Sequence, residues 1–560
     1  MGEDPRIDGG RNIAGYAAVR VRDAMGGVVY DYVIVGAGSA GCVLAARLGE
    51  DRDVRVAVIE AGPPDSEPVI HTPLACRQLF ESRFDWGLWS EPEPKLGGRR
   101  NLLPRGRVLG GSSSLNNMIY IRGNHADYDR WAAMGLPGWG YADVLPYFRR
   151  AEDNERGESY YHGTGGPLSV SDGRSRHPLA GACLEAAVDA GIAPTDDHNG
   201  PAQEGAGWFQ FTQRNGRRCS TADAYLHPAV ARGNVEVLTD ALATRIVFHG
   251  DQAVGIEVLR DNTLKTVRAA REVIVCAGAY HSPHLLLLSG IGPAGELRTL
   301  GIEPRLDLPV GRNLHDHPIV VIVWLTDQPS LGTAMTPENL KLFEREGRGP
   351  LTSGFSEGGA FIRTRPELDA PDVQFHFGGG PASKEAADPP IPHDGFSILP
   401  TLLTPTSRGR VTLRNRLPHA KPRILHNYYA TGHDTRTMIG GTRVALEIAS
   451  RPALRKLRRA DWAVPESDSD GDILDFARRN TRTIFHPVGT CAMGAVVDSE
   501  LRVHGVERLR VVDASVMPVV PRGNTNAPVI MVAEKAADLI RGLPPLPRQD
   551  ATQAHAGPAH

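Results

Sequence analysis

Residues 30–60 read YDYVIVGAGSAGCVLAARLGEDRDVRVAVIE and contain the pattern of a complete β-α-β unit. The first apolar run, 30–35, is typical of a parallel strand that is covered on both faces. A G-x-G-x-x-G motif at 36–41 follows, then a helical segment at 42–48, then a second strand that ends at residue 59. This order predicts a dinucleotide-binding unit near the start of the chain.

Each part of the motif suits a pyrophosphate. Gly36 permits a tight turn, Gly38 lets the backbone approach the phosphates, and Gly41 allows the helix to pack closely on the strand. The helix N-terminus adds free N–H groups and partial positive charge. Glu60 lies 19 residues after Gly41, where its carboxylate can accept hydrogen bonds from ribose hydroxyls. This motif alone does not distinguish NAD from FAD.

A second glycine-rich segment, GRVLGGSSSLN at 106–116, favours FAD. It places two glycines and three serine hydroxyls in a row. Backbone N–H and hydroxyl groups in such a loop can surround a second phosphate-containing stretch. A plain Ser/Gly linker is the alternative interpretation.

Further strand patterns at 272–276 and 509–512 indicate that one parallel layer is assembled from the start, middle and end of the chain. Between them, segments such as 373–377 and 409–413 read as antiparallel strands. We therefore predict an α/β fold (α+β overall): a Rossmann-like FAD-binding domain with an inserted substrate-binding domain built on an antiparallel sheet. The predicted ranges are 28–165, 216–320 and 484–543 for the first domain, 166–215 and 321–483 for the second, and 1–27 and 544–560 for flexible termini.

Composition excludes several classes of protein. The chain has 560 residues, 41% of them apolar and 23% charged, with a formal net charge of −3. No basic surplus indicates nucleic acid. No secretory signal and no run of 18 apolar residues is present, so we expect a cytoplasmic protein without an integral membrane segment. The six cysteines form no C-x-x-C pair.

Taken together, these motifs resemble the glucose-methanol-choline (GMC) oxidoreductase family of FAD-dependent enzymes, with choline and alcohol dehydrogenases most alike. The resemblance is carried by segments 36–41, 106–129, 278–292, 311–317, 486–490 and 512–538. It implies FAD-dependent oxidation of a primary alcohol to an aldehyde, with hydride transfer to flavin N5. The implied electron acceptor is O₂ or a quinone-like carrier.

The resemblance also implies which residues bind the cofactor: Gly36, Gly38, Ser39, Ala40, Gly41, Glu60, Ala61, Gly111, Ser112, Asn116, Met118, Ala243, Asp513, Ala514 and Ala527. Some relatives carry a histidine immediately before the residue that corresponds to Asn116, and that histidine is covalently joined to the flavin. Leu115 occupies this position here and has no nucleophilic atom, so we expect non-covalent FAD.

Oxidation of an alcohol requires a base for the hydroxyl proton, and a histidine pKa of about 6.5 suits that role. The resemblance assigns the base to His486 and its hydrogen-bonding partner to Asn526. A helix N-cap is the alternative interpretation of Asn526, which lies two residues before Pro528. We expect that helix to point its N-terminus at the flavin N1–C2=O edge, where its dipole would stabilise negative charge by ~0.3–2 kcal/mol.

The resemblance extends to the substrate side. Glu357 lies in a segment that in choline-oxidising relatives faces a trimethylammonium group, so we expect a choline- or aminosugar-like cation, with Phe355 in cation–π contact. A structural Glu357 and a neutral benzylic or aliphatic alcohol are the alternative. Phe485 is expected to shape the pocket. His315-Asp316-His317 matches a structural loop of the family, so no metal site is expected.

Three other functions remain open. Hydroxynitrile lyases share the family and keep FAD without net redox work. An NAD-dependent dehydrogenase follows from the first glycine motif alone. A non-catalytic flavin-binding protein would tolerate the loss of His486.

Overall fold

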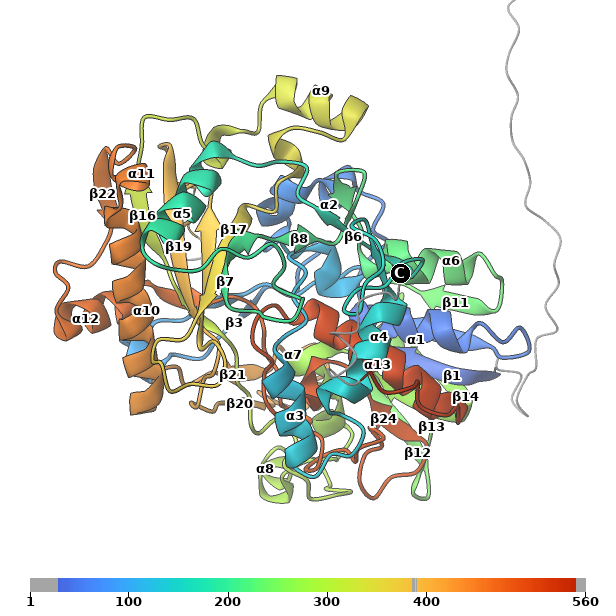
Figure 1. Ribbon diagram of the computed structural model, residues 1–560. Coiled ribbons are helices and arrows are strands. Elements are labelled where there is room, and N and C mark those ends of the chain that lie inside the picture. The colour runs from blue at the N-terminus through green and yellow to red at the C-terminus, as the bar shows by residue number, and fades with distance from the viewer. Residues whose placement is uncertain (1–28, 385–387, 389, 550–560) are drawn as a thin grey trace, which may run out of the picture.

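The computed structural model describes residues 29–384, 388 and 390–549, and two large sheets organise them (Figure 1). The first sheet has the strand order β11-β2-β1-β14-β13-β12, with β24 paired to β14. Its strands are β1 (Val29–Val35), β2 (Val56–Ile59), β11 (Val235–Leu238), β12 (Leu242–His249), β13 (Gln252–Arg260), β14 (Thr263–Val275) and β24 (Leu509–Val511).

The predicted β-α-β unit forms the centre of this sheet. Strand β1 pairs in parallel with both β2 and β14, and β24 adds in parallel to β14. Helix α1 (Ser39–Leu48) connects β1 to β2 and packs against the last long helix, α13 (Asn526–Arg541). Segments from the start, middle and end of the chain thus share one layer, as predicted.

Strands β12 and β13 were not predicted. They form an antiparallel meander with β14, which is 13 residues long, and its first half is mostly exposed. Only the last three residues, Val273–Val275, are consistently buried. Because the exposed half carries charged and polar side chains, only the buried end of β14 forms an apolar run in the sequence.

The second sheet has the order β22-β16-β19-β18-β17-β7, with β15 paired to β19 and β23, and every pair is antiparallel. Its strands are β7 (Gly205–Trp208), β15 (Pro318–Val320), β16 (Ile322–Leu325), β17 (Ser356–Ile362), β18 (Val373–Gly378), β19 (Gly395–Leu402), β22 (Ala460–Ala463) and β23 (Thr481–Thr483). Helices α5 (Pro178–Asp189) and α10 (Gly432–Ser450) pack against this sheet (Figure 1). The α/β fold class with an antiparallel second sheet is confirmed.

The strands can be compared with the expected domain ranges. All strands of the first sheet lie within 28–165, 216–320 and 484–543, and those of the second lie within 166–215 and 321–483 except β15. The segment 409–413 contributes β20 (Arg410–Thr412), which pairs with β21 (Arg423–Leu425) outside the second sheet. The predicted leader 1–27 and most of the predicted tail 544–560 lie outside the described residues.

The remaining longer helices are α3 (His125–Ala133), α4 (Tyr141–Ala151), α7 (Gly278–Leu288), α8 (Ala294–Thr299), α9 (Pro337–Glu346) and α12 (Asp470–Asn480). Within the described ranges, no helix combines the length and apolarity needed to cross a bilayer.

Candidate active site

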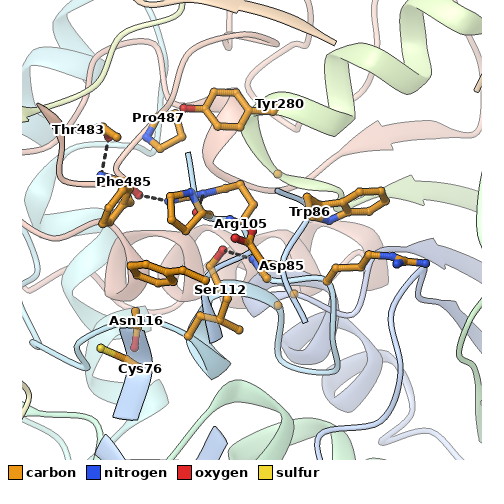
Figure 2. A pocket seen from close by; sticks show the side chains of 18 of the residues that line it. Cys76, Asp85, Trp86, Arg105, Ser112, Asn116, Tyr280, Thr483, Phe485 and Pro487 are labelled. Atoms are coloured by element: carbon orange, nitrogen blue, oxygen red, sulfur yellow. Dashed lines mark hydrogen bonds between the residues drawn. The ribbon is translucent and has the colours of Figure 1, made fainter. Parts of the chain in front are cut away.

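A cavity of about 950 Å³ lies between the two sheets. Strands β1, β2, β14 and β24 are parallel, so their carboxyl ends meet at one edge, and the residues that follow them line the cavity. Side chains of the second sheet and of the segments around 76–86 and 482–487 line the other end (Figure 2). This is the crevice at strand ends where open α/β sheets bind ligands.

The cofactor end depends on close backbone approach. Gly36 has φ +101°, and a Cβ there would lie 2.5 Å from the Cys276 carbonyl oxygen. A Cβ on Gly41 would lie 1.9 Å from the Gly36 carbonyl oxygen, and one on Gly111 would lie 2.7 Å from Gly38 Cα. The two glycine-rich segments therefore meet across the cavity, and only glycine fits at these contacts.

Glu60 is buried at the end of β2 and lines the same end of the cavity. Its two carboxylate oxygens accept hydrogen bonds from the backbone N–H groups of Ala37 (2.9 Å) and Gly62 (2.8 Å). Burial raises the Glu60 pKa to about 7, although these bonds oppose the shift. Each oxygen can accept a further hydrogen bond, so ribose hydroxyls would fit here.

Two helix N-termini reach the cavity without a side-chain cap. Neither α1 nor α13 has a capping hydrogen bond or an acidic residue in its first turn. The Ser39 hydroxyl donates to Asn526 Oδ1 at 2.7 Å and links the two helix starts. Exposed N–H donors and helix dipoles at both points favour negative charge. A diphosphate at α1 and the electron-rich edge of a flavin at α13 match this donor set, so the residues present fit FAD.

Most of the predicted site residues line this one cavity: Gly36, Gly38, Ser39, Ala40, Glu60, Ala61, Gly111, Ser112, Asn116, Met118, Ala243, Phe355, Phe485, His486, Asp513, Ala514 and Asn526. Three described residues, Gly41, Ala527 and Glu357, lie outside the lining. Leu115, in the position where some relatives attach the flavin, also lines the cavity and is buried.

The buried carboxylate of Asp316 positions His486. Its Oδ1 accepts the backbone N–H groups of His317 (2.9 Å) and His486 (2.8 Å). Its Oδ2 accepts the hydroxyls of Tyr428 (2.6 Å) and Thr483. The predicted structural loop at 315–317 therefore acts directly on the candidate base, which the sequence did not reveal.

The residue before His486 has an unusual backbone conformation. Phe485 has φ +71°, a region that non-glycine residues rarely adopt. Its N–H donates to the Thr483 hydroxyl at 2.7 Å, and its carbonyl accepts from Arg105 Nη2 at 2.6 Å (Figure 2). Such strained residues cluster at functional sites, where the surrounding structure holds them.

A chain of hydrogen bonds assigns the proton positions on His486. His317 Nε2 lies 3.2 Å from the Leu403 carbonyl oxygen, which can only accept, so Nε2 carries the proton. In the neutral ring, His317 Nδ1 is then an acceptor, and it lies 3.1 Å from His486 Nδ1. His486 must therefore be protonated at Nδ1, which leaves the lone pair on Nε2 for a proton from another molecule.

The rings around His486 are neutral at physiological pH. Burial, followed by the charges that His317, His376 and Arg105 can carry, holds the His486 pKa well below 6.5. Burial also lowers the pKa of His317 to about 4 and that of His376 to about 3. His376 lines the cavity, and its buried Nε2 has no hydrogen-bond partner within the described chain. A neutral imidazole is the form that can accept a proton.

The amide that contacts His486 is that of Asn524, whereas the sequence prediction named Asn526. Asn524 Nδ2 lies 3.3 Å from His486 Nε2, and Asn524 Oδ1 accepts from Gln374 Nε2 at 3.4 Å. Asn526 is bonded to Ser39 instead. It is also not the N-cap of α13, which is Thr525. Both amides line the cavity, but they have different hydrogen-bond partners.

Glu357 is directed away from the cavity. Its Oε2 accepts the backbone N–H of His177 at 2.5 Å, at the start of α5, and its Oε1 is buried without a partner in the described chain. The ladder between β17 and β18 has a bulge at 356/358, and Ser356 faces the cavity. The expected contact of Glu357 with a substrate cation is therefore not present in this arrangement.

The ring nitrogens of His315 are both bonded within the protein: Nδ1 lies 2.6 Å from the Asn313 carbonyl oxygen, and Nε2 accepts the Val520 N–H at 2.9 Å. Elsewhere, Asp65, Asp223 and His227 bring possible ligand atoms within 4.8 Å of one another, outside the cavity lining.

Comparison with known proteins identifies the family. Two family models, both described as GMC oxidoreductase, match residues 30–319 and 405–533. An uncharacterized GMC-type oxidoreductase of Mycobacterium tuberculosis is 45% identical over 91% of this chain and 99% of its own. An oxygen-dependent choline dehydrogenase of Brucella anthropi is 44% identical over 93% of this chain and 97% of its own.

Solved structures of flavoenzymes also resemble this chain. Pyridoxine 4-oxidase from Mesorbium loti superposes with a TM-score of 0.85 at 33% identity, covering 92% of this chain and 99% of that one. A formate oxidase variant from Aspergillus oryzae, studied for FAD modification, superposes with a TM-score of 0.86 at 26% identity. The match covers 94% of this chain and 99% of that one. The predicted family and cofactor are thus confirmed: the chain belongs to the GMC oxidoreductase family and is an FAD-dependent oxidoreductase.

Proposed function

We propose that this oxidoreductase converts a primary alcohol to an aldehyde, with His486 as the proton acceptor. One observation carries the proposal: the hydrogen-bond chain from Leu403 through His317 leaves His486 Nε2 unprotonated, with its lone pair turned to the cavity residue Asn524. His486 also lines the cavity whose other end suits FAD. Two similar proteins are named choline dehydrogenase and pyridoxine 4-oxidase, and both names refer to a substrate that is an alcohol.

Each residue around the substrate end has a separate role in the proposed reaction. His486 Nε2 accepts the hydroxyl proton, and the resulting charge is shared through the Nδ1–H bond to His317. Asn524 Nδ2, within 3.3 Å of the same nitrogen, orients the alcohol oxygen. His376 Nε2, which has no partner in the described chain, is a second hydrogen-bonding group for the alcohol oxygen. FAD, when bound, supplies the acceptor for the two electrons.

Two further features belong to this proposal. Because the Leu115 side chain at the cavity wall has no nucleophilic atom, FAD is held non-covalently. The acceptor that reoxidises the flavin, O₂ or a quinone-like carrier, stays a prediction from the sequence.

The test is flavin reduction by alcohols under anaerobic conditions, measured by loss of absorbance. The wild-type protein should be bleached by at least one alcohol, which a lyase of this fold would not show. His486→Ala should retain FAD but react at least ~10²-fold more slowly, because a general base contributes at least that factor. His504→Ala, at an exposed histidine, is the matched control. A reduction rate for His486→Ala within a few-fold of the control would contradict the proposal.

A further inference from the structure

We propose that the alcohol carries an anionic group, such as a carboxylate, and that Arg77 and Arg482 bind this group at the substrate end of the cavity. This inference rests on the proposed function, since it names the class of alcohol that the same site takes.

The two arginines come from distant segments and meet at one point. Arg77 lies in the 3-10 helix Pro73–Leu79 and Arg482 in β23, and both line the cavity. Arg77 Nη1 donates to Ser383 Oγ at 2.8 Å, and Arg482 Nη1 donates to the Ser383 carbonyl oxygen at 3.0 Å. Ile319 of β15 pairs with Arg482 and fixes its register. Both guanidinium groups are thus hydrogen-bonded to the same loop residue, Ser383.

Each guanidinium has a buried nitrogen that the described chain does not satisfy. Arg77 Nη2 and Arg482 Nε have no hydrogen-bond partner there. A buried donor without an acceptor is destabilising. A carboxylate accepts several hydrogen bonds and matches the planar fork of a guanidinium, and both arginines line the cavity, so an anion there would meet two under-satisfied guanidinium groups.

The local charge balance favours an anion. Burial and the neighbouring Arg77 lower the pKa of Arg482 to about 10, and burial lowers the pKa of Arg77 as well. Asp388 opposes the shift at both arginines, and it also acts on Arg99 and Lys384. Among the described residues, Asp388 is therefore the one carboxylate that acts on both Arg77 and Arg482.

The acidic residues of the cavity do not offer a site for a cation. Its lining carboxylates are Glu60, Asp85 and Asp513, and both oxygens of each accept N–H or hydroxyl groups of the chain. All three belong to segments of the predicted nucleotide-binding domain, and Glu357 lies outside the lining. The described residues therefore favour a negatively charged substrate over a choline-like one.

Apolar side chains also line this end of the cavity. The lining of this end includes Ile319, Leu331, Phe355, Leu399 and Ile484. A substrate that fits has its hydroxymethyl group at His486 Nε2, an apolar body along these walls, and its carboxylate at Arg77 and Arg482.

The first test compares three alcohols of similar shape with the FAD-loaded protein: 4-(hydroxymethyl)benzoate, benzyl alcohol and 4-(hydroxymethyl)benzyltrimethylammonium. The carboxylate should give a kcat/KM for anaerobic flavin reduction at least ~10-fold above the other two, because charge-assisted hydrogen bonds are the stronger ones. An equal or higher value for the neutral or cationic alcohol would overturn the inference and leave the proposed function intact.

The second test uses binding alone, and thus does not depend on turnover. Titration of the wild-type protein with 4-methylbenzoate, which has no hydroxyl group, should perturb the flavin absorbance spectrum. Arg482→Gln and, separately, Arg77→Gln should each raise its dissociation constant at least ~10-fold. Arg345→Gln, at an exposed arginine of α9, should not.

The outcomes separate the two claims. If no alcohol bleaches the flavin but 4-methylbenzoate binds through the arginines, the proposed function fails and the anion site stands. If Arg482→Gln or Arg77→Gln lowers the kcat/KM of benzyl alcohol as much as that of 4-(hydroxymethyl)benzoate, the arginines only support the loop at Ser383, and the anion site is wrong.

Discussion

The two ends of the cavity are built on different principles. The cofactor end uses backbone: glycines that pass within van der Waals contact of one another, two uncapped helix N-termini, and one carboxylate at a strand end. The substrate end uses side chains, and His317, His486, Asn524 and Arg77 come from four segments far apart in the chain. A backbone site tolerates almost no change at its contacts, whereas a side-chain site can be adjusted one group at a time.

The largest expected effect is at the cofactor end. Gly41→Ala would place a Cβ 1.9 Å from the Gly36 carbonyl oxygen, and neither backbone can move without shifting β1 from α1. We expect the purified protein to lack FAD and to lose about 1–3 kcal/mol of stability, the usual range for overpacking. The ratio of flavin to protein absorbance and a thermal melt measure both.

The matched control is Gly295→Ala in α8, where an added Cβ meets no atom within 4 Å. It should keep a full complement of FAD. A yellow Gly41→Ala protein with the melting temperature of this control would show that the close approach is not needed.

A smaller effect is expected at the substrate end, where neighbouring asparagines have different partners. Asn524→Ala removes the amide beside His486 and should lower kcat/KM for the alcohol about 10-fold with FAD retained, the scale of one hydrogen bond to a polar group. Asn526→Ala breaks the bond to Ser39 and should mainly weaken FAD binding. Steady-state kinetics and FAD titration of the two variants distinguish them, and the reverse pattern would restore the assignment made from sequence.

The same contrast explains how far the sequence predicted the site. The motif at 36–41 and Glu60 could be predicted because a strand, a turn and a helix follow one another locally. Asn524 was missed by two residues because α13 begins at Asn526, so the side chain that reaches His486 comes from the turn before the helix. The orientation of a turn residue has no periodicity that a sequence could reveal.

Glu357 lies outside the cavity lining, unlike the sequence expectation, for a related reason. Neighbouring residues of a strand face opposite sides of a sheet, and in β17 the residue that lines the cavity is Ser356, not Glu357. The roles of Asp316 and His317 depend on pairing between segments 170 residues apart. Only the tertiary structure brings such groups together.

The pH dependence of anaerobic flavin reduction tests the central claim most directly. A histidine with a lowered pKa stays neutral, and thus able to accept a proton, until the pH falls below that pKa. Because burial holds the His486 pKa well below 6.5, the reduction rate constant should stay level from pH 8 through 6.5 and fall only at lower pH. A fall that is already half complete at or above pH 6.5 would contradict a buried, neutral His486 as the proton acceptor.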